Sequence, residues 1–362
     1  MSDNKDEIKV IMQRKKDGIE IPLSNNVQSR FSSNYLEYVK LIHNALPEVN
    51  FDEIDLSTTF LTYNFGSPII IDSMTGGTPE ALKINSRLAK IAEKYRLGMG
   101  LGSQRAGLKS QSLAETYSIA RKNAPSAFLI ANIGGPQLSE GLDLNSIFDI
   151  ISMIEANALV IHLNPLQELI QPEGEPKYKG VYNKIVEIKD KIDIPIIVKE
   201  VGSGISKEVA LKLEKANIDS INIAGSGGTS WAGVERIRAG QLKDSLKEHL
   251  GDLFWDWGIP TAQSLLEVKS SVRLPVIASG GIRNGLEIAK CLVLGASMCA
   301  LAYPFLKAAA DSEESLLKFV NFLLTELKSV MFLTGTSYIS QLASLRYILT
   351  GELADRVNKN GC

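Results

Sequence analysis

Eight short apolar runs, each followed by a small polar or glycine-bearing turn and then by a helix-like stretch, constrain this chain more than any other feature. Several are nearly continuous in Val, Ile, Leu and Ala, which is typical of strands buried on both faces of a parallel sheet. Eight strand-then-helix units predict an α/β fold of the (β/α)8 class, a TIM barrel; a doubly wound sheet, which usually has fewer strands, is the alternative. The runs are SPIIID from Ser67, LGMGLG from Leu97, AFLIANI from Ala127, ALVIHLN from Ala158, PIIVKEV from Pro195, SINIAG from Ser220, PVIASG from Pro275 and SMCALA from Ser297.

The barrel pattern divides the chain into two parts. Residues 66–362 form the predicted barrel, which ends in amphipathic helices after Ala302. Residues 1–65 form an N-terminal extension, in which a basic group stands in a polar stretch with little to pack. Residues 225–268 make the sixth connection far longer than an ordinary loop, so we expect it to carry function or structure of its own.

Composition narrows the classes of function. The 39 basic and 41 acidic side chains give a net charge of −2, which favours neither nucleic acid nor an anionic membrane as a partner. The N-terminus lacks the apolar core of a signal peptide, and no apolar stretch is long enough to span a membrane. The cysteines, Cys291, Cys299 and Cys362, fit neither a disulfide framework nor a metal site. We therefore expect a globular cytoplasmic protein.

Chemistry in such barrels lies at the carboxyl ends of the strands. The seventh run leads into SGGIRNG, where Gly281, Ile282 and Arg283 suit a phosphate bound on backbone N–H groups, facing Ala302 and Tyr303 after the eighth run. A plain tight turn is the alternative interpretation.

Lys199 stands inside the apolar run IIVKEV. Burying an unpaired ammonium is costly, so Lys199 must be paired or lie beside an anion. A flavin edge, a Schiff base and an ion pair with Glu200 are the three possibilities.

The fourth run ends in HLNPLQE. Strand alternation places His162 and Asn164 on one face, toward the barrel mouth, with Gln167 and Glu168 above them. One carboxylate among amides suits Mg²⁺, which keeps waters and shares substrate phosphates. A single histidine such as His162 is more often structural than catalytic.

The remaining strand ends add amides, hydroxyls and cations around the same mouth, including GSQR from Gly102 and AGSGGTSW from Ala224. We find no Ser-His-Asp set, no CxxC motif and no conspicuous carboxylate pair. This combination indicates an anionic substrate and a phosphorylated cofactor that supplies the chemistry.

Together these motifs resemble the type 2 isopentenyl-diphosphate isomerases, FMN-dependent barrels that interconvert isopentenyl and dimethylallyl diphosphate. The matching stretches span most of the chain: Arg14-Lys15, SMTGG, GSQR, HLNPLQE, QPEG, VKEVGSG, AGSGGTSW, WGIPTA and SGGIRNG. Two positions depart from the family pattern, since Gly18 replaces a frequent histidine and Asn222 a frequent aspartate.

The resemblance implies a reduced FMN kept reduced by NADPH, a Mg²⁺ ion, and a homo-oligomer (tetramer or octamer). FMN would contact Ser73, Met74, Thr75, Ser103, Asn132, Lys199, Thr229, Gly281, Ile282, Arg283, Ala302 and Tyr303. The substrate would contact Arg14, Lys15, Ser103, Gln104, Arg105, His162, Asn164 and Gln167. Glu168 would hold Mg²⁺, and Gln167 and His162 would act at the reacting end.

Two other functions compete with this one. An FMN-dependent 2-hydroxy acid oxidase would use a late histidine, and the last histidine here is His249. A flavin-binding sensor or scaffold would show no turnover with either isomer under reducing conditions.

Overall fold

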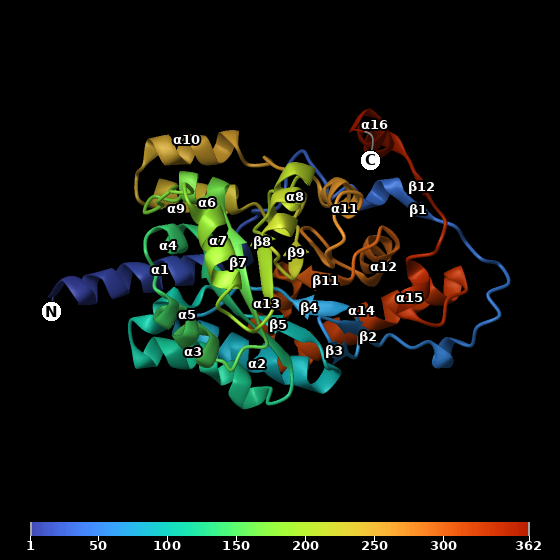
Figure 1. The fold of residues 1–362 in the computed structure, drawn as a ribbon, viewed down its shortest axis with the longest axis horizontal. Coiled ribbons are helices and arrows are strands. Elements are labelled where there is room, and N and C mark those ends of the chain that lie inside the picture. The colour runs from blue at the N-terminus through green and yellow to red at the C-terminus, as the bar shows by residue number, and fades with distance from the viewer. Residues whose placement is uncertain (1, 361–362) are drawn as a thin grey trace.

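The computed structural model describes residues 2–360, and its centre is a closed barrel of eight parallel strands (Figure 1). Each predicted apolar run coincides with one of them, β6 extending one residue beyond its run, so the (β/α)8 barrel is confirmed and the doubly wound sheet is excluded. The strands are β4 (Ile69–Ile71), β5 (Gly98–Gly100), β6 (Phe128–Gly134), β7 (Ala158–Leu163), β8 (Ile196–Glu200), β9 (Ser220–Asn222), β10 (Val276–Ser279) and β11 (Met298–Leu301).

The strands are continuously apolar because each one buries both faces. In β4, Ile70 packs inside the barrel, whereas Ile69 and Ile71 pack outward against the helices. Phe60 and Phe65, from the hairpin β2 (Thr58–Phe60) and β3 (Tyr63–Phe65), join the interior cluster. The interior is thus filled by side chains, and the strands' carboxyl ends are left to form a site.

Helices surround the barrel and complete its outer core. Thr78 caps the first of them, since its hydroxyl oxygen accepts a hydrogen bond from the Ala81 N–H at 3.1 Å. The surrounding helices are α2 (Pro79–Tyr95), α3 (Gln111–Asn123), α5 (Leu144–Ser152), α7 (Val181–Lys189), α8 (Lys207–Lys215), α11 (Thr261–Lys269), α12 (Gly285–Val293), α13 (Tyr303–Asp311) and α14 (Glu313–Thr334).

The N-terminal extension is structured and tied to the barrel. It begins with helix α1 (Ser2–Ser24), which contacts α9 (Trp231–Gln241) of the long sixth connection. Further along, β1 (Val39–Leu41) pairs antiparallel with β12 (Tyr347–Leu349) near the C-terminus. The expectation that α1 has little to pack is wrong, because Ile11, Ile19 and Ile21 are buried.

The sixth connection also contains α10 (Ser245–Leu253), and the chain closes with α15 (Ile339–Leu342) and α16 (Gly351–Asn360). Among the described helices, none combines the length and apolarity that a membrane crossing requires. Cys291 on α12 and Cys299 on β11 are free, buried thiols, and Cys362 lies outside the described residues.

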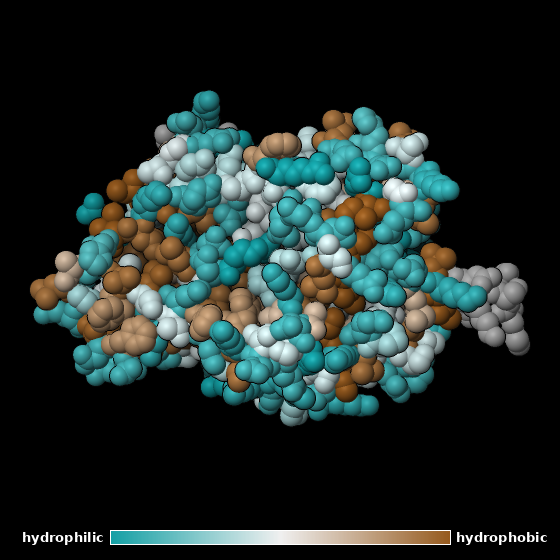
Figure 2. All heavy atoms as spheres, turned by 180° about the vertical axis from the view of Figure 1, so that it is seen from behind, coloured by the Kyte–Doolittle hydropathy of each residue, from teal (hydrophilic) through white to brown (hydrophobic). Residues whose placement is uncertain are grey.

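On the face that Figure 2 shows, most side chains are polar, and apolar side chains gather at one end. Ile42, Leu46, Phe51 and Leu333 are among the exposed apolar side chains. The Phe51 ring packs on Phe332, with 6.0 Å between the ring centroids. The N–H of Asn44 donates to the carbonyl oxygen of Leu333, which joins this loop to the end of α14.

Candidate active site

A cavity opens at the carboxyl ends of the barrel strands and is bounded by α1 and α9. Its empty volume is about 1460 Å³, which includes some open solvent.

The cavity brings together nearly all of the predicted site residues. Thr75 and Gln104 are the exceptions. Gln104 is fully buried: its amide N–H donates to the Ile150 carbonyl oxygen, and its Oε1 accepts from the Asn132 N–H. The Thr75 hydroxyl donates a hydrogen bond to the Asn85 side-chain oxygen, a contact that supports the cavity wall. The residues that do line the cavity are Arg14, Lys15, Ser73, Met74, Ser103, Arg105, Asn132, His162, Asn164, Gln167, Glu168, Lys199, Thr229, Gly281, Ile282, Arg283, Ala302 and Tyr303.

The turn after β10 is shaped for close backbone approach. Gly281 has a φ of +71°, and a Cβ on Gly228 would lie 2.5 Å from the Gly281 nitrogen. Arg283 stands two residues before α12 and donates from Nη2 to the Gln28 side-chain oxygen at 2.7 Å. Burial lowers the pKa of Arg283, and an anion in the turn would relieve that cost.

Lys199 is paired with Asp72, with 2.8 Å between Nζ and Oδ2, and both side chains are buried. The interpretation that Lys199 forms an ion pair with Glu200 is therefore wrong. The Glu200 carboxylate instead accepts hydrogen bonds from the backbone N–H groups of Val201, Gly202 and Ser203. Burial raises the pKa of Glu200 to about 7.

His162 is fixed by Asn132. The Asn132 amide N–H donates to the Leu101 carbonyl oxygen, so its Oδ1 accepts from His162 Nδ1 at 2.7 Å. In the neutral ring, Nε2 is then the acceptor nitrogen. Burial, with the charges of Lys15 and Lys199, lowers the pKa of His162 to about 3.

Three cations from two parts of the chain meet in the cavity. Arg14 and Lys15 come from α1, and Arg105 follows β5. Lys15 Nζ donates to the Ser103 carbonyl oxygen at 2.9 Å. Burial, together with Arg14 and Arg105, lowers the pKa of Lys15 to about 7. Such a cluster is stabilised by a multiply charged anion.

Glu168 lies in the first turn of α6 (Pro165–Ile170), almost fully buried. Its Oε1 accepts from the Asn164 side-chain amide at 3.1 Å and its Oε2 from the Glu175 N–H at 3.0 Å. Within residues 2–360, no three His, Cys, Asp or Glu side chains are grouped so as to hold a metal. A metal beside Glu168 would need the rest of its ligands from substrate and water.

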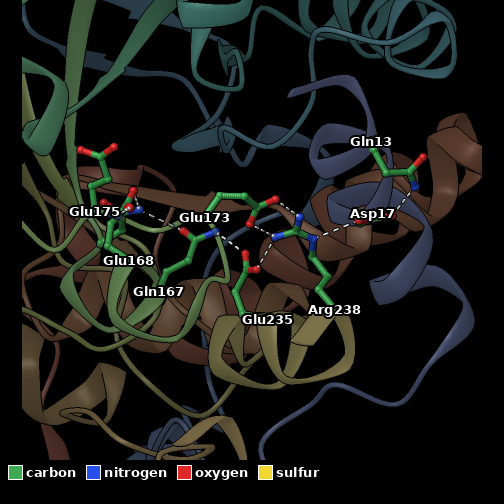
Figure 3. Close-up of polar contacts among 9 residues, drawn as sticks. Gln13, Asp17, Gln167, Glu168, Glu173, Glu175, Glu235 and Arg238 are labelled. Atoms are coloured by element: carbon green, nitrogen blue, oxygen red, sulfur yellow. Dashed lines mark hydrogen bonds and ion pairs between the residues drawn. The ribbon is translucent and has the colours of Figure 1, made fainter. Parts of the chain in front are cut away.

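Gln167 is held between two neighbours (Figure 3). Its amide N–H donates to Glu235 Oε1 at 3.0 Å, and its Oε1 accepts from Asn164 Nδ2 at 3.2 Å. Glu235 and Arg238, on α9, were missed by sequence reasoning and line the cavity. Their opposite charges three residues apart are also typical of a surface ion pair, so the sequence offers only a weak signal.

The two departures from the family pattern lie in different surroundings. Gly18 lines the cavity, and a Cβ there would lie 3.8 Å from the Trp231 ring. Asn222 is buried in β9, where its side-chain oxygen accepts from the Ser279 hydroxyl at 2.6 Å. The first departure therefore affects the cavity, while the second affects the strand interior.

The FMN-dependent dehydrogenase family profile matches residues 157–348. An isopentenyl-diphosphate delta-isomerase of Methanosarcina mazei is 43% identical over 98% of this chain and 96% of that protein. One of Nostoc sp. is 46% identical over 91% of this chain and 93% of that protein.

Solved structures share the fold at low sequence identity. A flavocytochrome b2 mutant with pyruvate bound has a TM-score of 0.68 at 18% identity, covering 96% of this chain and 86% of that one. A lactate oxidase of Pediococcus acidilactici has a TM-score of 0.66 at 14% identity, covering 95% and 94%.

Proposed function

The chain belongs to the FMN-dependent isopentenyl-diphosphate delta-isomerases, and we propose that it interconverts isopentenyl and dimethylallyl diphosphate by a 1,3-allylic proton shift that uses reduced FMN and Mg²⁺. Each element of this proposal has a counterpart among the residues of the cavity.

The turn after β10 fits the FMN phosphate. The backbones of Gly228 and Gly281 approach closely beside the start of α12, and the buried Arg283 supplies a cation. Ile282, Ala302 and Tyr303 would complete the phosphate site. The ring would rest on Ser73 and Met74, with Thr75 supporting the wall, and its polar edge and ribityl chain would meet Ser103, Asn132, Lys199 and Thr229.

The cations Arg14, Lys15 and Arg105 fit the substrate diphosphate. Ser103, His162 and Asn164 would bond to it, and Gln104 would act through Asn132, to which it is hydrogen-bonded. Glu168 fits Mg²⁺ as a single protein carboxylate, because this ion takes its other ligands from phosphate oxygens and water.

An allylic shift adds a proton at the terminal carbon and removes one two carbons away. Bound reduced FMN supplies a group able to give and take a proton at the barrel mouth. The protein must orient the alkene and neutralise the diphosphate. Gln167 would lie beside the reacting carbons, with its amide fixed by Glu235 and Asn164. The His162 ring would be kept in place by its hydrogen bond to Asn132.

The observation that carries this proposal is that one cavity is lined by Arg283 and, apart from it, by the cation cluster of Arg14, Lys15 and Arg105. A cofactor phosphate and a substrate diphosphate require both. The test is an anaerobic assay of isopentenyl diphosphate with dithionite-reduced FMN and Mg²⁺. Formation of dimethylallyl diphosphate supports the proposal, and absence of product supports a sensor or scaffold.

The proposal extends to NADPH as the physiological reductant and to a cytoplasmic homo-oligomer, both on the family resemblance. The exposed apolar side chains of Ile42, Leu46, Phe51 and Leu333 are compatible with a contact between subunits.

A further inference from the structure

Arg238 lies at the centre of a buried cluster of charges that links three separate segments (Figure 3). Its side chain is 4% exposed. Nε donates to Asp17 of α1 at 2.9 Å, and Nη1 donates to Glu235 of α9 at 2.7 Å. Both terminal nitrogens bond to Glu173, in the loop that follows Glu168. One guanidinium thus holds three carboxylates from three elements.

The cluster is too charged to be explained by packing alone. Burial opposes the charge on Arg238, but its bonds to Glu173 and the charge of Glu235 raise its pKa. Burial raises the pKa of Glu235, and Arg238 opposes that rise. Both Glu235 oxygens accept hydrogen bonds, one from Gln167 and one from Arg238, so the Arg238 contact favours the ionised carboxylate.

An ionised Glu235 determines how the Gln167 amide is oriented. A carboxylate only accepts hydrogen bonds, so the Gln167 NH₂ group must face it. The Gln167 oxygen then faces Asn164 Nδ2, a donor. A flipped Gln167 would place oxygen against oxygen and NH₂ against NH₂, and a protonated Glu235 would remove the distinction.

The same guanidinium fixes α1. Asp17 lies on the helix that carries Arg14 and Lys15, only three residues after Arg14. The charge of Arg14 is further balanced by Glu173 and Glu235. The Asp17 bond thus holds in place the helix that presents both cations to the cavity.

We propose that Arg238 is a positioning residue that couples the docking of α1 over the substrate to the orientation of the Gln167 amide. This inference rests on the proposed isomerase function. In this proposal Arg238 acts through Asp17 on the binding cations and through Glu235 on Gln167, rather than on the substrate itself.

The test compares Arg238→Lys, Asp17→Asn and the double variant. Lysine keeps the charge but, as a single ammonium, cannot bond to three carboxylates in the same geometry. We expect Arg238→Lys to raise KM and lower kcat, each about tenfold, because both contacts are weakened. Asp17→Asn should raise KM about tenfold and leave kcat within about twofold, because Glu235 keeps its partner. The double variant should show the KM of Arg238→Lys, since Asp17 acts through Arg238.

Matched controls exist on the same helices. Arg236, two residues from Arg238, pairs with Glu248 and Asp252 on the exposed side of α9, so Arg236→Lys should leave kcat and KM unchanged. Glu20→Gln removes an exposed pair with Lys16 on α1 and should also be neutral.

A second readout needs no turnover. Inorganic pyrophosphate with Mg²⁺ should protect α1 of the wild-type holoenzyme from protease, and Arg238→Lys and Asp17→Asn should both weaken that protection while retaining FMN. If Arg238→Lys fails to fold, the KM and the protease protection of Asp17→Asn test the proposal by themselves.

Wild-type kinetics in Arg238→Lys, or independent multiplying effects in the double variant, would overturn the coupling. An unchanged KM in Asp17→Asn would overturn it as well. A wild-type protein without isomerase activity would instead refute the proposed function, and the pyrophosphate protection would still test the link between Arg238 and α1.

Discussion

The ammonium of Lys199 lies 2.8 Å from the carboxylate of Asp72, and both side chains are buried where β8 and β4 end. In the closed barrel β4 and β8 are not neighbours, so the pair spans the mouth rather than joining adjacent strands. The pair lets a cation face the proposed flavin site without being buried unpaired.

This pair yields a prediction about stability. Lys199→Met leaves the buried Asp72 carboxylate without its ion-pair partner, which should cost about 3–5 kcal/mol of unfolding free energy. Adding Asp72→Asn should recover much of the loss. Denaturant unfolding of the FMN-free protein measures both variants. Lys189→Met breaks the less buried pair with Asp219 and should cost less; equal losses in the two single variants would contradict the assignment.

Arg283→Ala should weaken FMN binding. One lost charge-assisted contact costs about 1.5–3 kcal/mol, or roughly ten- to a hundredfold in affinity. A fluorescence titration of FMN into the FMN-free protein checks this, with Arg273→Ala, an exposed arginine before β10, as the control. An unchanged dissociation constant would remove Arg283 from the phosphate site.

Glu168→Gln should lower activity by weakening the binding of Mg²⁺ and diphosphate. Glutamine keeps the size of the side chain but lacks the anionic oxygen that this ion prefers. Activity at raised Mg²⁺ should recover in part, whereas Glu187→Gln on the outer helix α7 should behave as the wild type. Lost activity with an unaltered Mg²⁺ dependence would show that Glu168 is not the ligand.

Arg14→Ala combined with Lys15→Ala should raise KM by about a hundredfold, as expected for the loss of two charge-assisted contacts, and should leave FMN affinity unchanged. Steady-state kinetics and the FMN titration separate the two effects. Lys16→Ala, an exposed neighbour paired with Glu20, is the control. A double variant with the KM of the wild type would show that Arg14 and Lys15 are only a solvated run of charges, as their sequence context suggests, and do not bind the substrate.

The lowered pKa of Lys15, about 7, predicts proton uptake when diphosphate binds, because the anion favours the charged amine. Pyrophosphate affinity should therefore fall as pH rises above about 7, and Lys15→Gln should show a weaker dependence. Calorimetry in buffers of different ionisation enthalpy counts the protons.

Lys15 also makes a prediction about unfolding. Between about pH 7 and its ordinary pKa of 10.5, the unfolded chain binds more protons at this site. The stability of the ligand-free protein attributable to Lys15 should thus rise through that window, with its destabilising effect complete below pH 7. Identical pH profiles for the wild type and Lys15→Gln, in both binding and stability, would contradict the lowered pKa.

The sequence predicted the barrel because its strands are buried on both faces, so that the runs of Ile, Val and Leu mark them directly. It also predicted most cavity residues, since parallel topology brings every strand end to one rim. His162, Lys199 and Arg283 needed only that rule to be placed together.

The remaining contacts depend on pairings between distant segments, which local pattern does not encode. Asp72 stood in a recognised motif, yet nothing in the sequence paired it with Lys199. Gln104 shares a motif with Arg105, but the short helix η3 (Gln104–Leu108) buries one side chain and leaves the other facing the cavity. Arg238 could be recognised only once α1 and α9 were in contact.

The central claim is that the chain moves protons without net redox change, and isomerisation in D₂O tests it most directly. The holoenzyme, with dithionite-reduced FMN and Mg²⁺, is incubated anaerobically with isopentenyl diphosphate, and the product is examined by NMR and FMN by absorbance. We predict dimethylallyl diphosphate carrying deuterium in the newly formed methyl group, with FMN still reduced. Product without solvent deuterium, or FMN oxidised in proportion to product, would contradict the account.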